Sequence, residues 1–251
     1  WQADINEFYN EKYIAIGLKN VSFTYLPTRA TLDSDTQVEH RKINMPAVLN
    51  NISIEIGKGE YVAFTGTTGC GKSTLLKLFM CLYAIDKGDR YIRCKDGAIP
   101  LTGKWRGLFA YVPQGNYLMS GSIRDIVCFS DMEAADNEAR IKTALMISCA
   151  DEFVYNLKEG IDTILGERGL GLSEGQMQRI AIARAIFSDK PVLMLDESTS
   201  ALDESTENRL LNNLKQMTDK TVIIVTHRMS VLSICDKVVE FGDDGINIYS
   251  I

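Results

Sequence analysis

The sequence has no apolar run long enough to cross a lipid bilayer. Its longest strand-like runs, such as Val192–Leu195 and Val222–Val225, are no longer than a short strand, whereas a membrane-spanning helix needs about 20 residues. The N-terminus also lacks the pattern of a secretory signal peptide. Because the first residue is Trp1 rather than methionine, we expect either a segment of a longer polypeptide or a processed chain.

An excess of positive charge is also missing. The 251 residues include 27 lysines and arginines against 33 aspartates and glutamates, which gives a formal net charge of −6. Proteins that bind nucleic acid broadly present a basic face. The composition therefore argues against nucleic acid as a partner.

The sequence has few of the side chains that build metal centres or disulfide frameworks. Its only histidines are His40 and His227, and none of its six cysteines forms a CxxC pair. A zinc site needs about four ligands at short spacing, so we expect none. Scattered thiols without a secretory signal are typical of reduced, mostly buried cysteines in a cytosolic protein.

The hydrophobic patterns that are present alternate between strands and helices. Strands are expected at 13–25, 48–56, 61–65, 109–112, 192–196 and 222–226, with a hairpin from 237–241 and 246–249. Helices are expected at 72–83, within 122–158, from 173 onward and around 210–217. Residues 28–46 are polar and indicate a long exposed loop. These patterns predict one α/β core, an N-terminal antiparallel β layer and a helical insert at 118–175.

A glycine-rich segment between an expected strand and an expected helix matches the pattern GxxxxGK[ST]. It reads GTTGCGKS from Gly66 to Ser73. Glycines let successive backbone N–H groups surround phosphate oxygens, and the following helix turns its positive dipole end toward them. Lys72 is expected to reach the β- and γ-phosphates, and the Ser73 hydroxyl to bind Mg²⁺. The alternative is a glycine-rich turn that only caps a helix. The residues expected to contact the nucleotide here are Gly66, Thr67, Thr68, Gly69, Cys70, Gly71, Lys72, Ser73 and Thr74.

Two carboxylates, Asp196 and Glu197, end the expected strand at 192–196. Beside a phosphate loop, Asp196 is expected to hold Mg²⁺, mainly through a water ligand. Glu197 stands one residue further out, where it can polarise an attacking water. The alternative is an acidic pair that caps a helix, because the hydroxyl residues 198–200 follow.

Several further segments resemble the motifs of ABC (ATP-binding cassette) ATPases. Leu172–Arg179 (LSEGQMQR) resembles the signature LSGGQ, and Tyr111–Gln114 (YVPQ) resembles the Q-loop. Ser200–Asp203 (SALD) resembles the D-loop, Thr226–Arg228 (THR) the H-switch, and Tyr25 the A-loop aromatic residue. Together with the phosphate loop and the acidic strand end, they follow the family's order, so the chain is identified as a member of this family.

The resemblance implies a P-loop NTPase (RecA-like) α/β fold. It implies that residues 1–117 form the antiparallel β layer and the first part of the core. Residues 118–175 would then form a helical subdomain that carries the signature, and residues 176–251 the remainder of the core. Together these would be one ATP-binding cassette, expected to come from a longer membrane protein.

The resemblance also implies roles for single residues in MgATP hydrolysis. It implies that Tyr25 stacks on adenine and that Gln114 contacts Mg²⁺ or the attacking water. His227 would contact the γ-phosphate and orient the water. The expected catalytic residues are therefore Glu197, His227, Lys72 and Gln114, and the expected metal ligands are Ser73, Gln114 and Asp196.

Ser173 and Gln176 form the pattern of a capping box, which predicts a helix start and thus a second anion-binding site. In ABC proteins two cassettes meet head to tail around two ATPs. The resemblance therefore implies that Ser173, Gly175 and Gln176 contact ATP on a second cassette, in a homodimer or a heterodimer, and that Asp203 communicates across that interface. The third signature residue is Glu174 instead of glycine. It either repels the γ-phosphate or, as we expect, points to solvent and favours the helix N-terminus.

Three kinds of ABC protein compete: the ATPase domain of an exporter, the separate ATPase subunit of an importer, and a soluble protein without a transport role. The gap of 58 positions from Gln114 to Leu172 leaves no room for a long coiled-coil arm, which disfavours the soluble class. Asn116–Asp125 and Gly166–Gly169 resemble exporter segments, and the second contacts transmembrane coupling helices in that class. We therefore expect an exporter cassette at the cytoplasmic face of a plasma or inner membrane, which touches the membrane only through a transmembrane domain.

Overall fold

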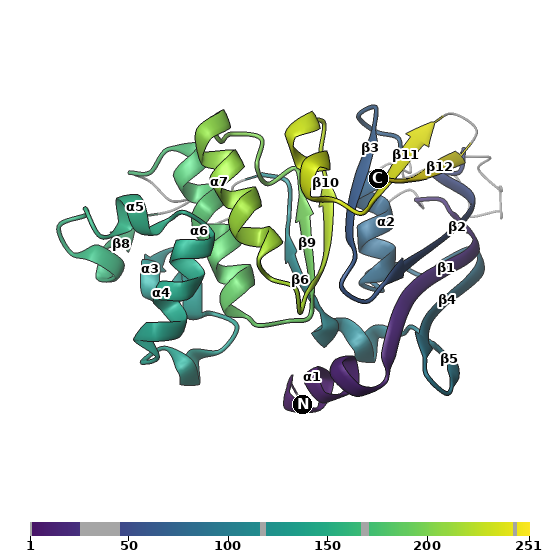
Figure 1. Cartoon of the computed structure of the whole chain (residues 1–251), viewed down its shortest axis with the longest axis horizontal. Coiled ribbons are helices and arrows are strands. Elements are labelled where there is room, and N and C mark those ends of the chain that lie inside the picture. The colour runs from purple at the N-terminus through teal and green to yellow at the C-terminus, as the bar shows by residue number, and fades with distance from the viewer. Residues whose placement is uncertain (1, 26–45, 116–118, 167–170, 243–244) are drawn as a thin grey trace, which may run out of the picture.

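The computed structural model describes residues 2–25, 46–115, 119–166, 171–242 and 245–251, which form two main β-sheets and the helices around them (Figure 1). The strands are β1 (Tyr13–Phe23), β2 (Leu49–Gly57), β3 (Tyr61–Gly66), β4 (Lys87–Cys94), β5 (Gly97–Pro100), β6 (Phe109–Val112), β7 (Gly121–Ser122), β8 (Ile164–Leu165), β9 (Val192–Asp196), β10 (Thr221–Val225), β11 (Lys237–Gly242) and β12 (Gly245–Ser250). The α-helices are α1 (Gln2–Glu11), α2 (Lys72–Phe79), α3 (Ile123–Cys128), α4 (Glu138–Ile147), α5 (Asp151–Val154), α6 (Glu174–Phe187) and α7 (Glu204–Lys215). Shorter 3₁₀ helices are η2 (Gly103–Leu108), η3 (Met132–Ala134), η4 (Gly160–Asp162) and η6 (Met229–Ile234).

The central element is a six-stranded sheet with the strand order β12–β11–β3–β10–β9–β6. Every neighbouring pair in it is parallel except β11 with the edge strand β12. Its middle strands are mostly apolar because both faces of the sheet are covered. Along β10, Val222 and Ile224 pack into one hydrophobic cluster, whereas Ile223 and Val225 pack into the other. The parallel direction brings the carboxyl ends of β3, β6, β9 and β10 to one edge.

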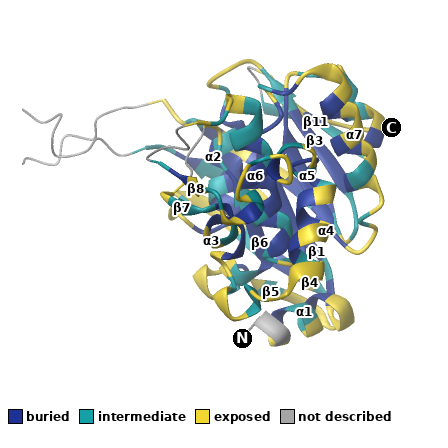
Figure 2. Ribbon diagram, turned by 90° about the vertical axis from the view of Figure 1, so that its left-hand side faces the viewer, coloured by how far each residue is buried: buried dark blue, intermediate teal, exposed yellow. Residues whose placement is uncertain are grey.

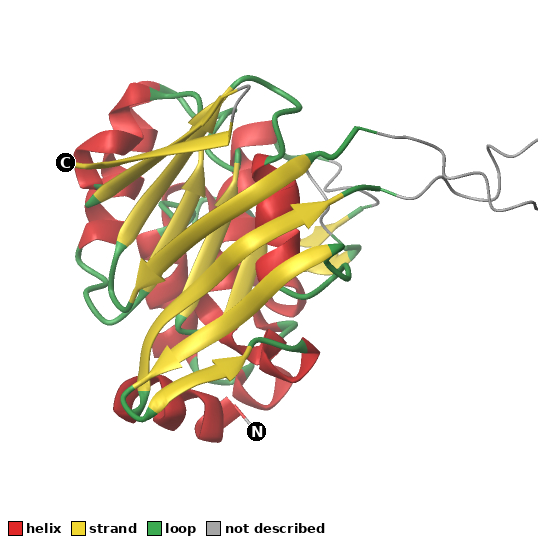
Figure 3. Cartoon of the chain, turned by 90° about the vertical axis from the view of Figure 1, so that its right-hand side faces the viewer, coloured by secondary structure: helices red, strands yellow, loops and turns green. Residues whose placement is uncertain are grey.

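One face of this sheet is covered by α2 and by an antiparallel sheet with the order β2–β1–β4–β5 (Figure 3). The α2 side chains of Leu75, Leu76, Leu78 and Phe79 are fully buried in the cluster between the two sheets. This packing holds the helix that follows the phosphate loop. It confirms the expected antiparallel layer over an α/β core.

The opposite face is covered by helices, of which α6 and α7 belong to the second hydrophobic cluster. The helices α3 and α4 pack against α6, and the short strands β7 and β8 pair beside them. Figure 2 shows the buried residues along the strands and the inner sides of these helices. The elements from β7 to β8 lie within 118–175, but a separate subdomain with these boundaries stays a prediction.

The helix α1 and the strands β4 and β5 have no counterpart among the sequence expectations. The helix α1 is polar overall, but its Ile5 and Tyr9 side chains are buried, and Tyr9 Oη lies 2.8 Å from Thr221 Oγ1 at the start of β10. The strand β4 is polar because one of its faces is open, and it pairs with both β1 and β5. Neither element has the hydrophobic pattern that sequence reasoning relies on.

Two further expectations can be compared with the structure. The helix expected at 72–83 ends at Phe79, since Cys81 adopts a positive φ of 54° that departs from a helical path. All six cysteines are free and four are buried, which confirms the expectation of mostly buried thiols. The loop expected at 28–46 lies outside the described residues apart from Pro46. In the described ranges, no helix combines the length and hydrophobicity needed to cross a bilayer.

Candidate active site

The predicted site residues follow the carboxyl ends of four parallel strands. The phosphate loop follows β3, Gln114 follows β6, Glu197 follows β9 and His227 lies just beyond β10. Ligands of open α/β sheets bind at this edge. The strand order therefore brings together segments that are far apart in the sequence.

The phosphate loop turns into α2 through glycines with left-handed backbone. Gly69 and Gly71 have φ of 86° and 103°, and a Cβ atom on Gly71 would lie 2.7 Å from Leu49 Cδ2, so only glycine fits there. Gly71 supplies no side chain to cap α2, so the first amides of the helix can face an anion. Lys72 is buried, and its Nζ donates to the carbonyl oxygens of Gly66 and Thr67 at 2.8 Å each. The loop thus holds an ammonium group inside its own curve.

The Asp196 carboxylate is buried beside the start of α2. Ser73 Oγ donates to Asp196 Oδ1 at 2.8 Å, and Tyr111 Oη donates to Asp196 Oδ2 at 2.8 Å. The sequence analysis includes Tyr111 only as the first residue of the segment that resembles a Q-loop, and it predicts no contact between Tyr111 and Asp196. Burial, followed by the charge of Asp196, raises the pKa of Tyr111 well above its usual value, so its hydroxyl stays protonated.

Glu197 stands between two other predicted residues. Its Oε2 accepts a hydrogen bond from Gln114 Nε2 at 2.6 Å, and its Oε1 lies 3.2 Å from His227 Nε2. Glu197 has a left-handed backbone with φ 49°, and its N–H donates to the Val225 carbonyl at 3.0 Å. Because its side chain is about one-fifth exposed and that of His227 about half, the pair faces an open space.

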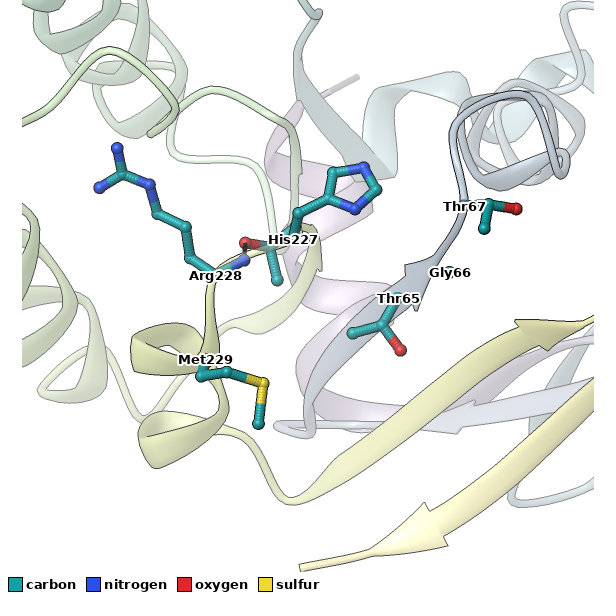
Figure 4. Close-up of a pocket in the computed structure, with 7 residues that line it drawn as sticks. Thr65, Gly66, Thr67, His227, Arg228 and Met229 are labelled. Carbon is teal, nitrogen blue, oxygen red and sulfur yellow. Dashed lines mark hydrogen bonds between the residues drawn. The ribbon is translucent and has the colours of Figure 1, made fainter.

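A cleft of about 310 Å³ lies between the phosphate loop and the end of β10. It is lined by Thr65–Thr67 on one side and by Thr226–Met229 on the other (Figure 4). The Arg228 side chain points away from the phosphate loop, and its Nη2 donates to the Ser200 carbonyl at 2.8 Å. Thr65 and Met229 were not expected to border the site, since their positions depend on the pairing of β3 with β10.

Tyr25 lies next to the helix that follows the phosphate loop. Its hydroxyl is 3.1 Å from Thr74 Oγ1, and its ring makes edge-on contacts with Phe23 and Tyr83 at centroid distances of 4.8 and 5.4 Å. The predicted adenine-stacking residue is therefore beside the phosphate loop. Tyr83 is a neighbour that sequence reasoning missed, because it follows the end of α2.

The capping box predicted at the start of α6 is present. Gln176 N–H donates to Ser173 Oγ at 3.3 Å, and Ser173 N–H donates to Gln176 Oε1 at 2.9 Å. Glu174 is exposed in the first turn of α6, where a carboxylate favours the positive end of the helix dipole. A Cβ atom on Gly175 would lie 2.9 Å from the Ala201 carbonyl oxygen, so this glycine allows close approach to the loop after β9.

The start of α6 does not join the phosphate loop within the same chain. Residues of α6 pack into the cluster on one face of the six-stranded sheet, whereas α2 packs into the cluster on the other face. The single chain therefore holds two separate helix starts that can face an anion.

Asp203 caps α7 by accepting from Thr206 N–H at 3.0 Å, and this hydrogen bond lowers the pKa of Asp203.

The residues around Asp196 fit Mg²⁺ in their chemistry. Ser73, Gln114 and Asp196 offer hydroxyl, amide and carboxylate oxygens, the hard donors that Mg²⁺ prefers. Across the described part of the chain, no three His, Cys, Asp or Glu side chains gather closely enough to hold a metal ion. The donor set suits an ion that takes its remaining ligands from water and substrate phosphates.

The comparisons with known proteins agree with this arrangement. The family model described as "ABC transporter" matches residues 49–200. The chain is 35% identical over 241 residues to a "Putative export ATP-binding/permease protein" of Rickettsia felis, covering 96% of this chain and 39% of that protein. It is 36% identical over 225 residues to "Leukotoxin translocation ATP-binding protein LktB" of Mannheimia glucosida, covering 89% and 29%.

A solved structure gives the same result for the fold. "Structure of a bacterial Atm1-family ABC exporter with ATP bound" matches with a TM-score of 0.79 at 29% identity, over 95% of this chain and 39% of that chain. The chain thus spans well under half the length of these relatives. Two exporter-like segments were expected from the sequence, at 116–125 and 166–169. Their residues 116–118 and 167–169 lie outside the described residues.

Proposed function

Because the chain belongs to the ABC transporter family as an exporter-type ATP-binding domain, we propose that it hydrolyses MgATP to drive the export of a substrate across a membrane. The observation that carries this proposal is the Glu197 carboxylate, which lies against Gln114 and His227 beside the phosphate loop. The names of the relatives favour an exporter over an importer subunit or a soluble ABC protein.

We propose the following roles for the residues of this site. Lys72 and the loop amides bind the phosphates, and Tyr25 stacks on adenine, a contact worth about 1–3 kcal/mol. Glu197 and His227 orient a water for in-line attack on the γ-phosphate. These roles agree with the positions of the side chains at the carboxyl edge of the sheet.

The proposal includes Mg²⁺ as a cofactor, held by Ser73, Gln114 and Asp196. When bound, this ion would supply positive charge at the β- and γ-phosphate oxygens. Ser73 and Asp196 would hold the ion together, since Ser73 Oγ already lies 2.8 Å from Asp196 Oδ1.

The proposed partner is a second cassette that completes each ATP site. The helices α2 and α6, whose starts we propose as phosphate-binding sites, pack on opposite faces of one sheet. Ser173, Gly175 and Gln176 would then serve an ATP on the other cassette, with Asp203 at the interface. We also propose that the cassette contacts the coupling helices of a transmembrane domain. It would therefore lie at the cytoplasmic face of a plasma or inner membrane. Nucleic acid is not among the proposed partners.

Light scattering on Glu197→Gln tests the proposed dimer. With MgATP we expect the mass to rise from 28.0 kDa to about twice that value, because slow hydrolysis keeps the closed pair populated. ADP should give no rise, and neither should the double variant Lys72→Ala/Glu197→Gln. A chain that binds ATP and stays monomeric would contradict a self-sufficient homodimer and favour a heterodimer or a need for the transmembrane domain.

Cys70 provides a chemical test of the proposed phosphate site. It is half-buried in the loop with Sγ 3.8 Å from Lys72 Nζ. Among the buried thiols, burial raises the pKa of Cys128 to about 11 and of Cys235 to about 12. Since the thiolate is the reacting form, N-ethylmaleimide should label Cys70 before the buried thiols. We expect MgATP to slow this labelling severalfold.

Mass spectrometry of protein quenched at intervals identifies the labelled position. Cys70→Ser supplies the control, because labelling of its remaining cysteines, including the half-buried Cys94, should not depend on MgATP. Equal labelling rates with and without MgATP would remove Cys70 from the nucleotide contacts.

A further inference from the structure

The two oxygens of the buried Asp196 carboxylate each accept one hydroxyl hydrogen bond. Ser73, on α2, bonds Oδ1, and Tyr111, on β6, bonds Oδ2, both at 2.8 Å. The Asp196 residue is only 1% exposed, so neither oxygen can readily find a substitute donor in water. The carboxylate is therefore held from two sides by residues of different elements.

Tyr111 is placed for this contact by strand pairing. β6 runs parallel to β9, with Tyr111 opposite Met194, and Gln114 follows three residues later. The phenol ring packs against the cluster between the two sheets. Since the ring is held by packing and the strand by hydrogen bonds, the hydroxyl oxygen is held beside Asp196 Oδ2.

The energetic consequence concerns orientation. Hydrogen bonds to a charged group contribute about 1.5–3 kcal/mol to stability. A residue that hydrogen-bonds to a metal-binding side chain commonly fixes the orientation of that side chain, and the affinity of the site for the metal depends on this orientation. Without the Tyr111 hydroxyl, Asp196 would keep a donor on Oδ1 only. Its carboxylate could then turn about the bond to Cβ.

We propose that Tyr111 is a positioning residue that orients the Asp196 carboxylate for holding Mg²⁺. This inference rests on the proposed function, in which Asp196 helps to hold that ion. It assigns to Tyr111 an effect on Mg²⁺ affinity rather than on nucleotide affinity, because its hydroxyl contacts the carboxylate and not the phosphate loop.

The test is Tyr111→Phe, which removes one oxygen atom and keeps the ring. Binding of a fluorescent N-methylanthraniloyl-ATP is followed while Mg²⁺ is titrated, and ATP hydrolysis is measured over the same Mg²⁺ range. We expect the half-saturating Mg²⁺ concentration to rise about 10- to 100-fold in both measurements. Nucleotide binding in EDTA and the hydrolysis rate at saturating Mg²⁺ should change less than about twofold.

Tyr91→Phe is the matched control. Tyr91 also donates a phenol hydrogen bond to a carboxylate, Glu55 Oε2 at 3.1 Å, but it lies in the antiparallel sheet. This variant should leave the Mg²⁺ titration unchanged. A 4-aminophenylalanine at position 111 restores an N–H donor and should return half-saturation toward the wild-type value.

Three results would overturn the proposal. One is a Tyr111→Phe protein with the wild-type Mg²⁺ half-saturation. Another is a lower rate at saturating Mg²⁺ with unchanged half-saturation, which indicates only a structural role. The third is a folded 4-aminophenylalanine protein that shows no recovery. If the wild-type protein itself shows no Mg²⁺-dependent binding of ATP, it is the proposed function that fails.

Discussion

Replacing Glu197 with glutamine is expected to lower the rate of ATP hydrolysis by about 10²–10⁴-fold, the range typical for loss of a general base. Glutamine has almost the same shape and can still contact Gln114 and His227, but it cannot accept a proton from water. Because the Glu197 side chain bonds to Gln114 and His227 rather than to the described residues of the phosphate loop, ATP affinity should stay close to that of the wild type. Phosphate release in a single turnover measures the rate, and titration of fluorescent ATP measures the affinity.

Glu240→Gln is the appropriate control for this prediction. Glu240 is an exposed carboxylate on β11 that accepts from Tyr249 Oη at 3.2 Å, so the same chemical change there should leave turnover unaffected. A Glu197→Gln protein that hydrolyses ATP at nearly the wild-type rate would exclude Glu197 as the base. His227 would then be the next candidate for the base, because its imidazole is the other titratable side chain at this contact.

Lys72→Ala is expected to weaken ATP binding about 100-fold. Its buried ammonium donates to two loop carbonyls, a position from which it can also meet phosphate oxygens. Hydrogen bonds between charged partners contribute about 1.5–3 kcal/mol each, and about 2.7 kcal/mol corresponds to 100-fold in affinity. Isothermal titration calorimetry with ATP and Mg²⁺ gives the affinity directly.

Lys77→Ala distinguishes this effect from a general loss of charge or helix stability. Lys77 lies in the last turn of the same helix and only partly buried, away from the loop. Its removal changes net charge by the same amount and should leave ATP affinity within about twofold. If Lys72→Ala, shown by circular dichroism to be folded, bound ATP as tightly as the wild type, the assignment of the phosphate loop would be wrong.

The parts of the fold that the sequence predicts are those with local chemical signals. The strands β9 and β10 were expected because unbroken apolar runs are typical of strands buried on both faces. The capping box at Ser173 is expected from residue spacing alone, and it is present with its reciprocal hydrogen bonds. In each case the information lies within a few residues.

The parts that sequence reasoning missed depend on contacts between distant segments. The polar helix α1 is held by Tyr9 against Thr221, more than 200 positions away. Likewise, the hydrogen bond from Tyr111 to Asp196 exists because β6 is the neighbour of β9. Strand order is a property of the whole chain, so residues that owe their role to it carry no local pattern.

The family resemblance supplied the site residues that spacing alone does not. Nothing near Gln114 or His227 indicates that both contact Glu197, yet the structure brings all three together. Their catalytic roles remain predictions until the variants are measured. Gln114, Glu197 and His227 lie close together because β6, β9 and β10 are neighbours in the sheet.

The left-handed backbone of Glu197 lowers thermal stability at a position where the side chain is needed for activity. With φ at 49°, a residue other than glycine costs about 1–2 kcal/mol relative to a relaxed conformation. Glycine would remove this cost, but it would leave no carboxylate between Gln114 and His227. Selection of variants for heat resistance alone would therefore favour loss of the side chain that the chemistry needs, so any engineering of this domain has to screen position 197 for turnover as well as for melting temperature.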